Sequence, residues 1–141
     1  MEKSFHHLIM KTYFAFHRSV MGEAKKLGLT SGQPKILEFL LEHDGVEQKD
    51  IATHCEIERA TAGSILDRME IAGLIERRRK TGNRRSVYVY LTESGRTAAL
   101  QVKKLFAEAE RRALAGLSET EAQRLRGELE EIYKNICNSE E

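Results

Sequence analysis

The stretch from Gln48 to Ile65 constrains the fold of this chain more than any other part of the sequence. Its apolar residues indicate two short helices, over 47–55 and 59–72, that are joined by a tight turn at Glu56–Ile57. The small residue Ala52 stands where the two helices must approach closely. This spacing is typical of a helix-turn-helix, whose second helix is held out from the protein body. The alternative is an ordinary pair of packed helices, because two-helix pieces are common.

A β-hairpin with a positively charged tip is predicted directly after these helices. Leu74–Glu76 and Ser86–Leu91 have strand character, and Thr81–Asn83 between them is a turn signal. The residues from Glu76 to Arg85 include six positive charges and one negative charge. A hairpin that follows a recognition helix is a wing, and arginines at its tip can enter a DNA minor groove. The alternative is a solvated strand edge that is protected by charge.

The outer face of the second helix would be free to enter a DNA major groove. Arg59 can reach a guanine or a phosphate, whereas Arg68, farther along, is expected to contact the DNA backbone. Arg77 and Arg79 are expected to share one side of their strand, and which side faces DNA stays open. The predicted DNA-binding residues are Arg59, Ala60, Thr61, Gly63, Ser64, Arg68, Arg84 and Arg85.

Long helices are predicted on both sides of this region. Residues 5–27 carry an apolar stripe at steps of three and four, and Phe14 lies outside that stripe. Apolar groups on two faces suggest a helix that is covered from two sides, as at a subunit interface; the alternative is a helix packed only on its own domain. Two more helices follow Thr92. Capping boxes are predicted at Thr30–Gln33 and Ser118–Glu121.

The order of several short motifs adds to this interpretation. They are Leu29-Thr-Ser-Gly-Gln-Pro-Lys-Ile-Leu37, Gln48-Lys-Asp-Ile-Ala52, Arg59-Ala-Thr61, Leu66-Asp-Arg-Met-Glu70, Gly73-Leu-Ile-Glu-Arg77, Asn83-Arg-Arg-Ser86 and Leu91-Thr-Glu-Ser-Gly95. Together, over roughly residues 29–96, they resemble the MarR (multiple antibiotic resistance regulator) family of winged-helix transcriptional regulators. The expected fold is mainly α-helical with a small β-hairpin wing, a winged helix-turn-helix with N- and C-terminal dimerisation helices.

The resemblance implies a function and a division of the chain. It implies a homodimer that is built from residues 1–28 and 93–141, around a DNA-binding lobe at 29–92, within one compact domain. It implies binding to a pseudo-palindromic operator, usually as a repressor, and often release by a small phenolic or other aromatic ligand.

Three positions depart from the family pattern. Asn83 stands where the wing often has Asp, and an amide orients Arg85 more weakly than a carboxylate does. Glu56 stands where Gly is frequent, so either no positive φ is required there or some strain is accepted. Glu58 replaces the usual Ser or Asp cap before the recognition helix and is a poorer cap.

Other kinds of site find less support in the sequence. The five histidines have no metal-ligand spacing, so we expect neither a metal nor another cofactor. Cys55 is expected to be buried and inert, and its distance from Cys137 fits a reducing compartment. An effector pocket between the lobes is expected, with candidate lining residues that also fit a plain core, so its ligand residues stay unknown. These candidates are Tyr13, Phe16, His17, Phe39 and Arg96.

The remaining features exclude some classes of protein. The chain lacks a Gly-rich phosphate loop, a nucleophile elbow and a metalloprotease motif, so we expect no enzyme. It also lacks an apolar run of membrane-spanning length and a signal-peptide pattern, so a cytoplasmic location is expected. Two other functions stay open: a winged helix that binds an acidic protein partner, and a helical domain that binds or converts a small molecule.

Overall fold

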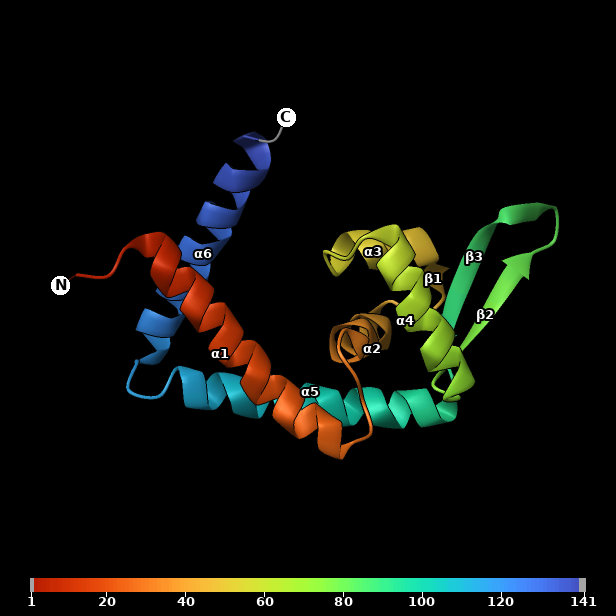
Figure 1. The fold of residues 1–141 in the computed structure, drawn as a ribbon, viewed down its shortest axis with the longest axis horizontal. Helices are drawn as coiled ribbons and strands as arrows, with labels where there is room; N and C mark the ends of the chain where they lie inside the picture. The colour runs from red at the N-terminus through yellow and green to blue at the C-terminus, as the bar shows by residue number, and fades with distance from the viewer. Residues whose placement is uncertain (1, 140–141) are drawn as a thin grey trace. The chain divides into compact units, whose positions relative to one another are not determined.

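The computed structural model describes residues 2–139, except for the side chains of residues 83 and 84. The chain divides into two compact units, one ending at Ala109 and the other starting at Glu110. Helices dominate the described residues, and a small antiparallel sheet accompanies them. This confirms the predicted fold class, a mainly helical chain with a β-hairpin (Figure 1).

Helix α1 runs from Phe5 to Lys26 and is anchored in the first unit by its C-terminal half. The Ser4 hydroxyl caps its start by accepting a hydrogen bond from the His7 amide at 3.4 Å. The only side chains of α1 that are buried are Val20 and Ala24. The N-terminal half therefore leaves much of its apolar surface uncovered within the described part of the chain.

Helix α2 (Gln33–Glu42) begins differently from the predicted capping box. The Gln33 side chain accepts from the Thr30 amide at 3.1 Å, but the Gln33 amide donates to the Thr30 carbonyl oxygen and not to its hydroxyl. Only half of the box therefore forms. The residue before the helix is Gly32, with φ 87°, a left-handed conformation that glycine adopts without steric cost. Pro34 lies in the first turn, as predicted.

The predicted helix-turn-helix consists of α3 (Gln48–His54) and α4 (Arg59–Ile71). Both helices pack their apolar faces on α2 and on the sheet, in one hydrophobic core. A close-packed core of this kind fixes the orientation of the opposite, outer face of α4. The largest fully buried side chains in it are Ile36, Leu37, Leu40, Ile51, Leu66, Met69, Ile75, Val89 and Val102.

The sheet has the strand order β1-β3-β2 and is antiparallel throughout. Strands β2 (Ile75–Lys80) and β3 (Asn83–Leu91) form the predicted hairpin, which projects beyond the helices in Figure 1. The basic run lies mostly within the strands, which are longer than the sequence pattern indicated. Strand β1 (Val46–Glu47) was not predicted, because two residues that pair with Val89 and Tyr88 are too short to show an alternating pattern.

Helix α5 (Glu93–Ala113) starts at a close contact between backbones. The Thr92 hydroxyl accepts from the Gly95 amide at 2.9 Å and donates to the Gly73 carbonyl oxygen at 2.6 Å. A Cβ on Gly95 would lie 1.9 Å from the Leu74 carbonyl oxygen, so only glycine fits. This contact ties the start of α5 to the segment between α4 and β2.

The second unit contains the end of α5 and helix α6 (Glu119–Ser139). Its predicted capping box is confirmed: the Glu121 amide donates to the Ser118 hydroxyl, and the Ser118 amide donates to the Glu121 carboxylate. Several large apolar side chains of α6 are exposed: Leu129, Tyr133 and Ile136. Over the described residues, the helices are all too short or too polar to cross a membrane.

Candidate nucleic-acid interface

Helix α4 presents a polar outer face opposite its buried side. Ala62, Ile65, Leu66 and Met69 are buried in the core, which leaves the predicted contact positions on the other side of the helix. Gly63 is half-buried, and a Cβ there would lie 3.6 Å from the Gln48 amide nitrogen of α3. The predicted contact residues of α4 that are exposed are Arg59, Ala60, Thr61, Ser64 and Arg68.

The N-terminal end of α4 is weakly held. Glu56, in the turn before it, has φ 55°, a left-handed conformation that costs a non-glycine residue about 1–2 kcal/mol. The chain therefore accepts strain at the position where the family often has glycine. Glu58 is the N-cap residue and makes no capping hydrogen bond with its side chain. It is a poor cap, as the sequence indicated.

The C-terminal half of α4 is tied to the hairpin through Arg77 of β2. Its guanidinium donates to Asp67 at 2.5 Å, to Glu70 at 3.1 Å and to the Gln48 amide oxygen of α3 at 3.4 Å. The Arg77 amide also donates to Glu70, at 3.1 Å. The hydrogen bond from the Arg77 side chain holds the pKa of Glu70 below its ordinary value.

Sequence reasoning missed this network and treated Arg77 as one of the possible DNA-facing cations. Two acids three residues apart on α4, Asp67 and Glu70, followed by a basic strand, were the signal that was available. Arg77, Arg79 and Val87 share one face of the hairpin with Glu70, which agrees with the prediction that the two arginines lie on one side. The side chain of Arg77 is only 21% exposed, so it fixes the hairpin on α4.

The other face of the hairpin is a ladder of cations and aromatic rings. The Arg78 guanidinium lies 4.4 Å from the centre of the Tyr90 ring, and the Lys80 ammonium lies 4.3 Å from the centre of the Tyr88 ring. Arg78 also pairs with Glu76 at 2.9 Å. Cation–π contacts of this kind are worth about 0.5–1 kcal/mol each at exposed sites, so the ladder stiffens the hairpin.

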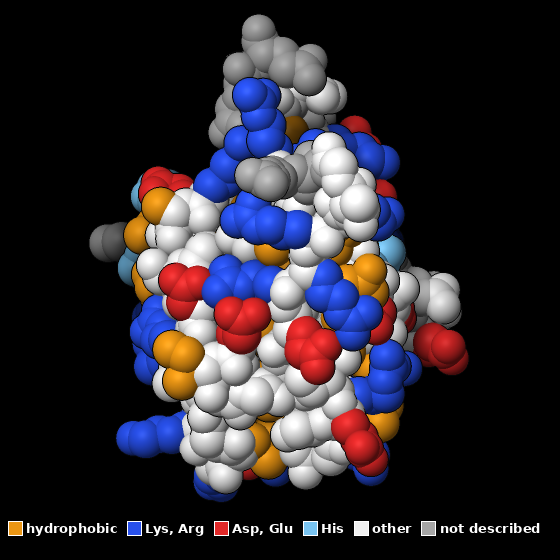
Figure 2. Space-filling view, turned by 90° about the vertical axis from the view of Figure 1, so that its right-hand side faces the viewer, with side chains coloured by type: hydrophobic (Ala, Val, Ile, Leu, Met, Phe, Trp, Pro, Cys, Tyr) orange, Lys and Arg blue, Asp and Glu red, His pale blue; other side chains and the backbone are white. Residues whose placement is uncertain are grey.

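A small hollow lies between the hairpin and the helix-turn-helix. Its volume is about 200 Å³, and Arg59 from α4 and Arg85 from β3 both line it. Arg85 is exposed. The predicted contact by the Arg84 side chain lies outside the described residues. Figure 2, which views this side of the molecule, shows blue Lys and Arg side chains from the hairpin end to the middle of the face, where red acidic groups meet them.

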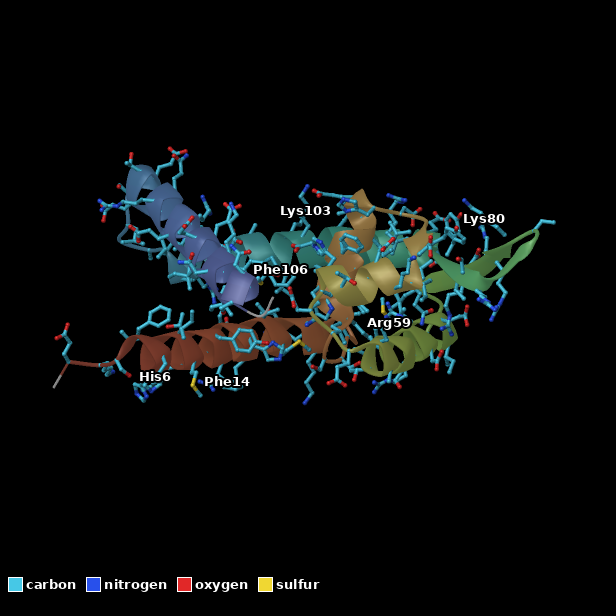
Figure 3. All side chains as sticks on the ribbon, turned by 90° about the horizontal axis from the view of Figure 1, so that it is seen from above. His6, Phe14, Arg59, Lys80, Lys103 and Phe106 are labelled. Atoms are coloured by element: carbon cyan, nitrogen blue, oxygen red, sulfur yellow. The ribbon has the colours of Figure 1, made fainter. Side chains whose placement is uncertain are left out.

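A larger cavity, of about 630 Å³, lies within the first unit against the N-terminal end of α4. Tyr13, Phe16 and His17 of α1 line it, as does Phe106, which Figure 3 shows on the side of α5 that faces α1. Its volume is within the usual range of ligand pockets. On the side of the helix-turn-helix, the cavity is lined by the turn and the first residues of α4: Cys55, Glu56, Ile57, Glu58 and Thr61.

Two residues that were considered for this pocket lie elsewhere. Phe39 stacks on His54, with ring centres 4.1 Å apart, and on His43 at 4.6 Å. Arg96 pairs with Asp44 at 3.5 Å. Sequence periodicity does not show which partner each of these side chains contacts, because that partner lies on another helix or loop.

Two other kinds of site, a reactive cysteine and a metal site, can be checked over the described residues. Cys55 is buried, as predicted, and burial raises the pKa of its thiol to about 11. The thiol is therefore protonated at neutral pH and a poor nucleophile. Within residues 2–139, no group of three or more His, Cys, Asp or Glu side chains is arranged to hold a metal ion.

Comparisons with known proteins agree with this geometry. The profile of the MarR family matches residues 29–87. The HTH-type transcriptional regulator PecS of Dickeya dadantii is 34% identical over 94 residues, which are 67% of this chain and 57% of PecS. The chain therefore spans somewhat over half of the length of that relative.

Solved structures extend the similarity to nearly the whole chain. The transcriptional regulator SlyA has a TM-score of 0.84 and 29% identity, over 93% of this chain and 95% of SlyA. The MepR–DNA complex of S. aureus has a TM-score of 0.87 over 95% of this chain and 99% of MepR; at 23% identity this is a likeness of fold. The motifs, the helix-turn-helix with its wing and these comparisons lead to one conclusion: this chain belongs to the MarR family of winged-helix transcriptional regulators.

Proposed function

We propose that the chain is a cytoplasmic repressor that binds a pseudo-palindromic operator as a homodimer and is released by a small aromatic ligand. The observation that carries the proposal is the exposed outer face of α4 beside a basic hairpin. In this arrangement α4 enters the major groove, while Arg85 of the hairpin reaches the adjacent minor groove. The DNA held by MepR, a protein of similar fold, supports this arrangement.

The role of each α4 residue on the DNA follows from its side-chain chemistry. Ala60, Thr61, Gly63 and Ser64 are small enough to allow close approach to base edges, and the two hydroxyls among them can hydrogen-bond to bases or phosphates. Arg68 lies farther along α4, where its Nε donates to the Ser64 carbonyl oxygen at 3.4 Å. From that position we propose that it contacts the DNA backbone, which orients the protein and carries no sequence information.

Exposed apolar surface on α1 and α6 supports the homodimer. Tyr13 is 59% exposed and Phe14 is 53% exposed, and as adjacent residues of a helix they point to different faces of α1. Apolar surface of this extent on neighbouring turns is typical of a protein interface. We propose that residues 1–28 and 93–141 form the dimer interface, around a DNA-binding lobe at 29–92.

The cavity of about 630 Å³ supports release by a ligand. Its aromatic lining suits a small aromatic molecule, and its wall includes the strained turn and Thr61 of α4. A ligand there would change the position of the N-terminal end of α4. DNA binding would weaken to the extent that the ligand binds this displaced conformation more tightly than the DNA-binding conformation.

Selection from a pool of randomised duplexes tests the DNA-binding part of the proposal. We expect an inverted repeat whose half-site centres are about one helical turn apart. Binding of the selected duplex should weaken steeply with salt, with a log–log slope of about −0.9 for each phosphate contact. Sedimentation should give twice the 16.1 kDa mass of the chain. A pool that yields no motif would favour an adapter for an acidic protein partner.

A further inference from the structure

We propose that His43 and His54 together bind one divalent transition-metal ion, with zinc as the expected ion, on the surface where α2 meets α3. The two histidines are 11 residues apart in the sequence, and each stands at the C-terminal end of a different helix. Spacing along the chain therefore did not indicate them as a pair. The inference goes beyond the proposed function and does not depend on DNA binding.

The distance between the two imidazole rings suits a single metal ion. Their centres lie 6.2 Å apart, and the rings are tilted by 39° relative to each other. Zinc binds an imidazole nitrogen at about 2.0–2.1 Å, which places the ion roughly 3.2 Å from the ring centre and two ligating rings at most about 6.4 Å apart. A tetrahedral ion brings the ring centres to about 5.2 Å. Both side chains are exposed, so they have room for this small approach.

The ring of Phe39 on α2 holds the two imidazoles beside each other. It stacks on His54 with ring centres 4.1 Å apart and on His43 with ring centres 4.6 Å apart. Phe39 itself is half-buried and packs against the hydrophobic core, so it restricts the orientations of both imidazoles. Side chains that are already restrained lose less conformational freedom when they bind a ligand.

A hydrogen bond leaves the outer nitrogen of His43 available to a metal. Nδ1 of His43 lies 3.3 Å from the Phe39 carbonyl oxygen, which can only accept, so Nδ1 carries the proton. In the neutral imidazole, Nε2 then has the lone pair that a metal ligand needs. Metal-binding histidines usually donate their other ring N–H to a carbonyl or carboxylate in this way. Within the described part of the chain, no hydrogen bond engages the ring nitrogens of His54.

The surroundings of the pair suit an exposed cation. Glu42 precedes His43 in the chain, and Asp50 stands one helical turn before His54 on α3; both carboxylates are exposed. In residues 2–139, no third His, Cys, Asp or Glu side chain is placed to join the pair as a ligand. Water molecules would therefore complete the coordination. Imidazole with water suits zinc and copper better than calcium or magnesium, which prefer oxygen ligands.

A bound ion would connect two helices of the first unit. His43 is the residue that ends α2, and His54 is the last residue of α3, shortly before the strained turn at Glu56. An ion held by both side chains would fix the end of α3 to the end of α2. It would also stabilise the folded chain, because the unfolded chain does not hold the two imidazoles together.

A zinc titration of the full chain, followed by calorimetry and NMR, tests this inference. We expect one zinc ion for each chain, and we expect the imidazole signals of His43 and His54 to shift together. His43→Ala and His54→Ala should each weaken zinc binding by at least about tenfold, since the loss of even an outer partner of a ligand has an effect of this size. In His43→Ala, the signals of His54 should no longer shift at the zinc concentration that saturates the unmodified chain.

His6→Ala is the matched control, because His6 is another exposed histidine, which Figure 3 shows at the N-terminal end of α1. It should leave the zinc affinity unchanged. Zinc should raise the thermal midpoint of the unmodified chain and of His6→Ala, and it should not raise that of His43→Ala or His54→Ala.

Thermal unfolding without zinc shows whether each variant keeps the fold. His43→Gln or His54→Gln, which retains a polar side chain, replaces an alanine variant that melts early under these conditions. Zinc binding that survives the loss of either His43 or His54 at full affinity would overturn the site. A stoichiometry of one ion for two chains, or shifts confined to one of the two imidazoles, would overturn it as well.

Discussion

The two ends of helix α4 are held in very different ways. At the C-terminal end, Arg77 connects Asp67, Glu70 and Gln48, and Gly95 of α5 packs on the Leu74 backbone. At the N-terminal end, the turn contains a strained residue, the Glu58 side chain makes no capping hydrogen bond, and a cavity of about 630 Å³ lies alongside.

This difference teaches how one helix can be both anchored and adjustable. The fixed end sets the orientation of α4 relative to the hairpin. The weakly held end carries Arg59 and Thr61, the residues proposed to meet DNA, and it is the end that a ligand in the cavity would contact. Segments that take part in switching are usually drawn from the less stable parts of a fold.

The largest expected change in the free energy of unfolding comes from a substitution at the fixed C-terminal end of α4. Gly95→Ala should lower the free energy of unfolding by about 3 kcal/mol or more, because the new Cβ meets a backbone oxygen that has little room to move. Urea unfolding measures this. Gly127→Ala in α6 is the matched control: nothing lies within 4 Å of its Cβ position, so a gain of about 0.5–1 kcal/mol is expected. Equal effects of the two substitutions would contradict the close contact.

The Arg77 network should show the next largest effect. Arg77→Ala should lower the free energy of unfolding by about 1–2 kcal/mol, because it removes hydrogen bonds to charged groups and leaves two neighbouring carboxylates without their common partner. Arg78→Ala, which removes an exposed ion pair on the other face of the hairpin, should destabilise the protein less than Arg77→Ala does. Thermal unfolding of both variants decides whether Arg77 is the structural arginine of the hairpin.

A better cap at the weakly held N-terminal end of α4 should stabilise the protein. Glu58→Ser should raise the free energy of unfolding by about 1 kcal/mol, because a serine hydroxyl can accept a hydrogen bond from an amide in the first turn. Glu58→Ala should change it little, since the present side chain makes no such bond. A clear loss of stability in Glu58→Ala would show that Glu58 already holds the end of α4.

The smallest effect concerns acid pH. Arg77 lowers the pKa of Glu70 in the folded chain, so the stabilisation is complete above the unfolded-state pKa of about 4.3 and is lost as the pH falls through the folded-state value. Because the Glu70 side chain is 43% exposed, the loss should be no more than about 1 kcal/mol. Glu70→Gln should flatten this part of the stability curve, and a curve of unchanged shape would contradict the assignment.

The sequence predicted the elements around α4 better than the contacts between them. Apolar periodicity located both helices, because burial imposes it directly. The capping box at Ser118–Glu121 was correct, whereas the one at Thr30–Gln33 formed only in part, because the helix is preceded by Gly32 in a left-handed conformation and the Gln33 amide donates to the Thr30 carbonyl oxygen. Glu56 shows the same limit: its positive φ is a property of the backbone that apolar periodicity does not report.

For the candidate site, too, the sequence predicted which residues are exposed better than which residues contact one another. Exposure of Arg59, Thr61 and Ser64 follows from the helical period of the buried residues of α4. The role of Arg77 did not follow, since strand alternation groups it with Arg79 without saying which face meets α4. The hollow shared by Arg59 and Arg85 likewise depends on the angle between hairpin and helix, which is a tertiary property.

Hydrogen exchange with and without the selected duplex tests the central claim most directly. The duplex should slow amide exchange over residues 56–64 and over 81–87 of the hairpin, and it should leave residues 70–76 and 93–100 nearly unchanged. A scrambled duplex at equal concentration should protect the same segments more weakly. Protection that falls mainly on residues 70–76, or that spreads evenly along the chain, would contradict a recognition helix that is anchored at one end and meets DNA with the other.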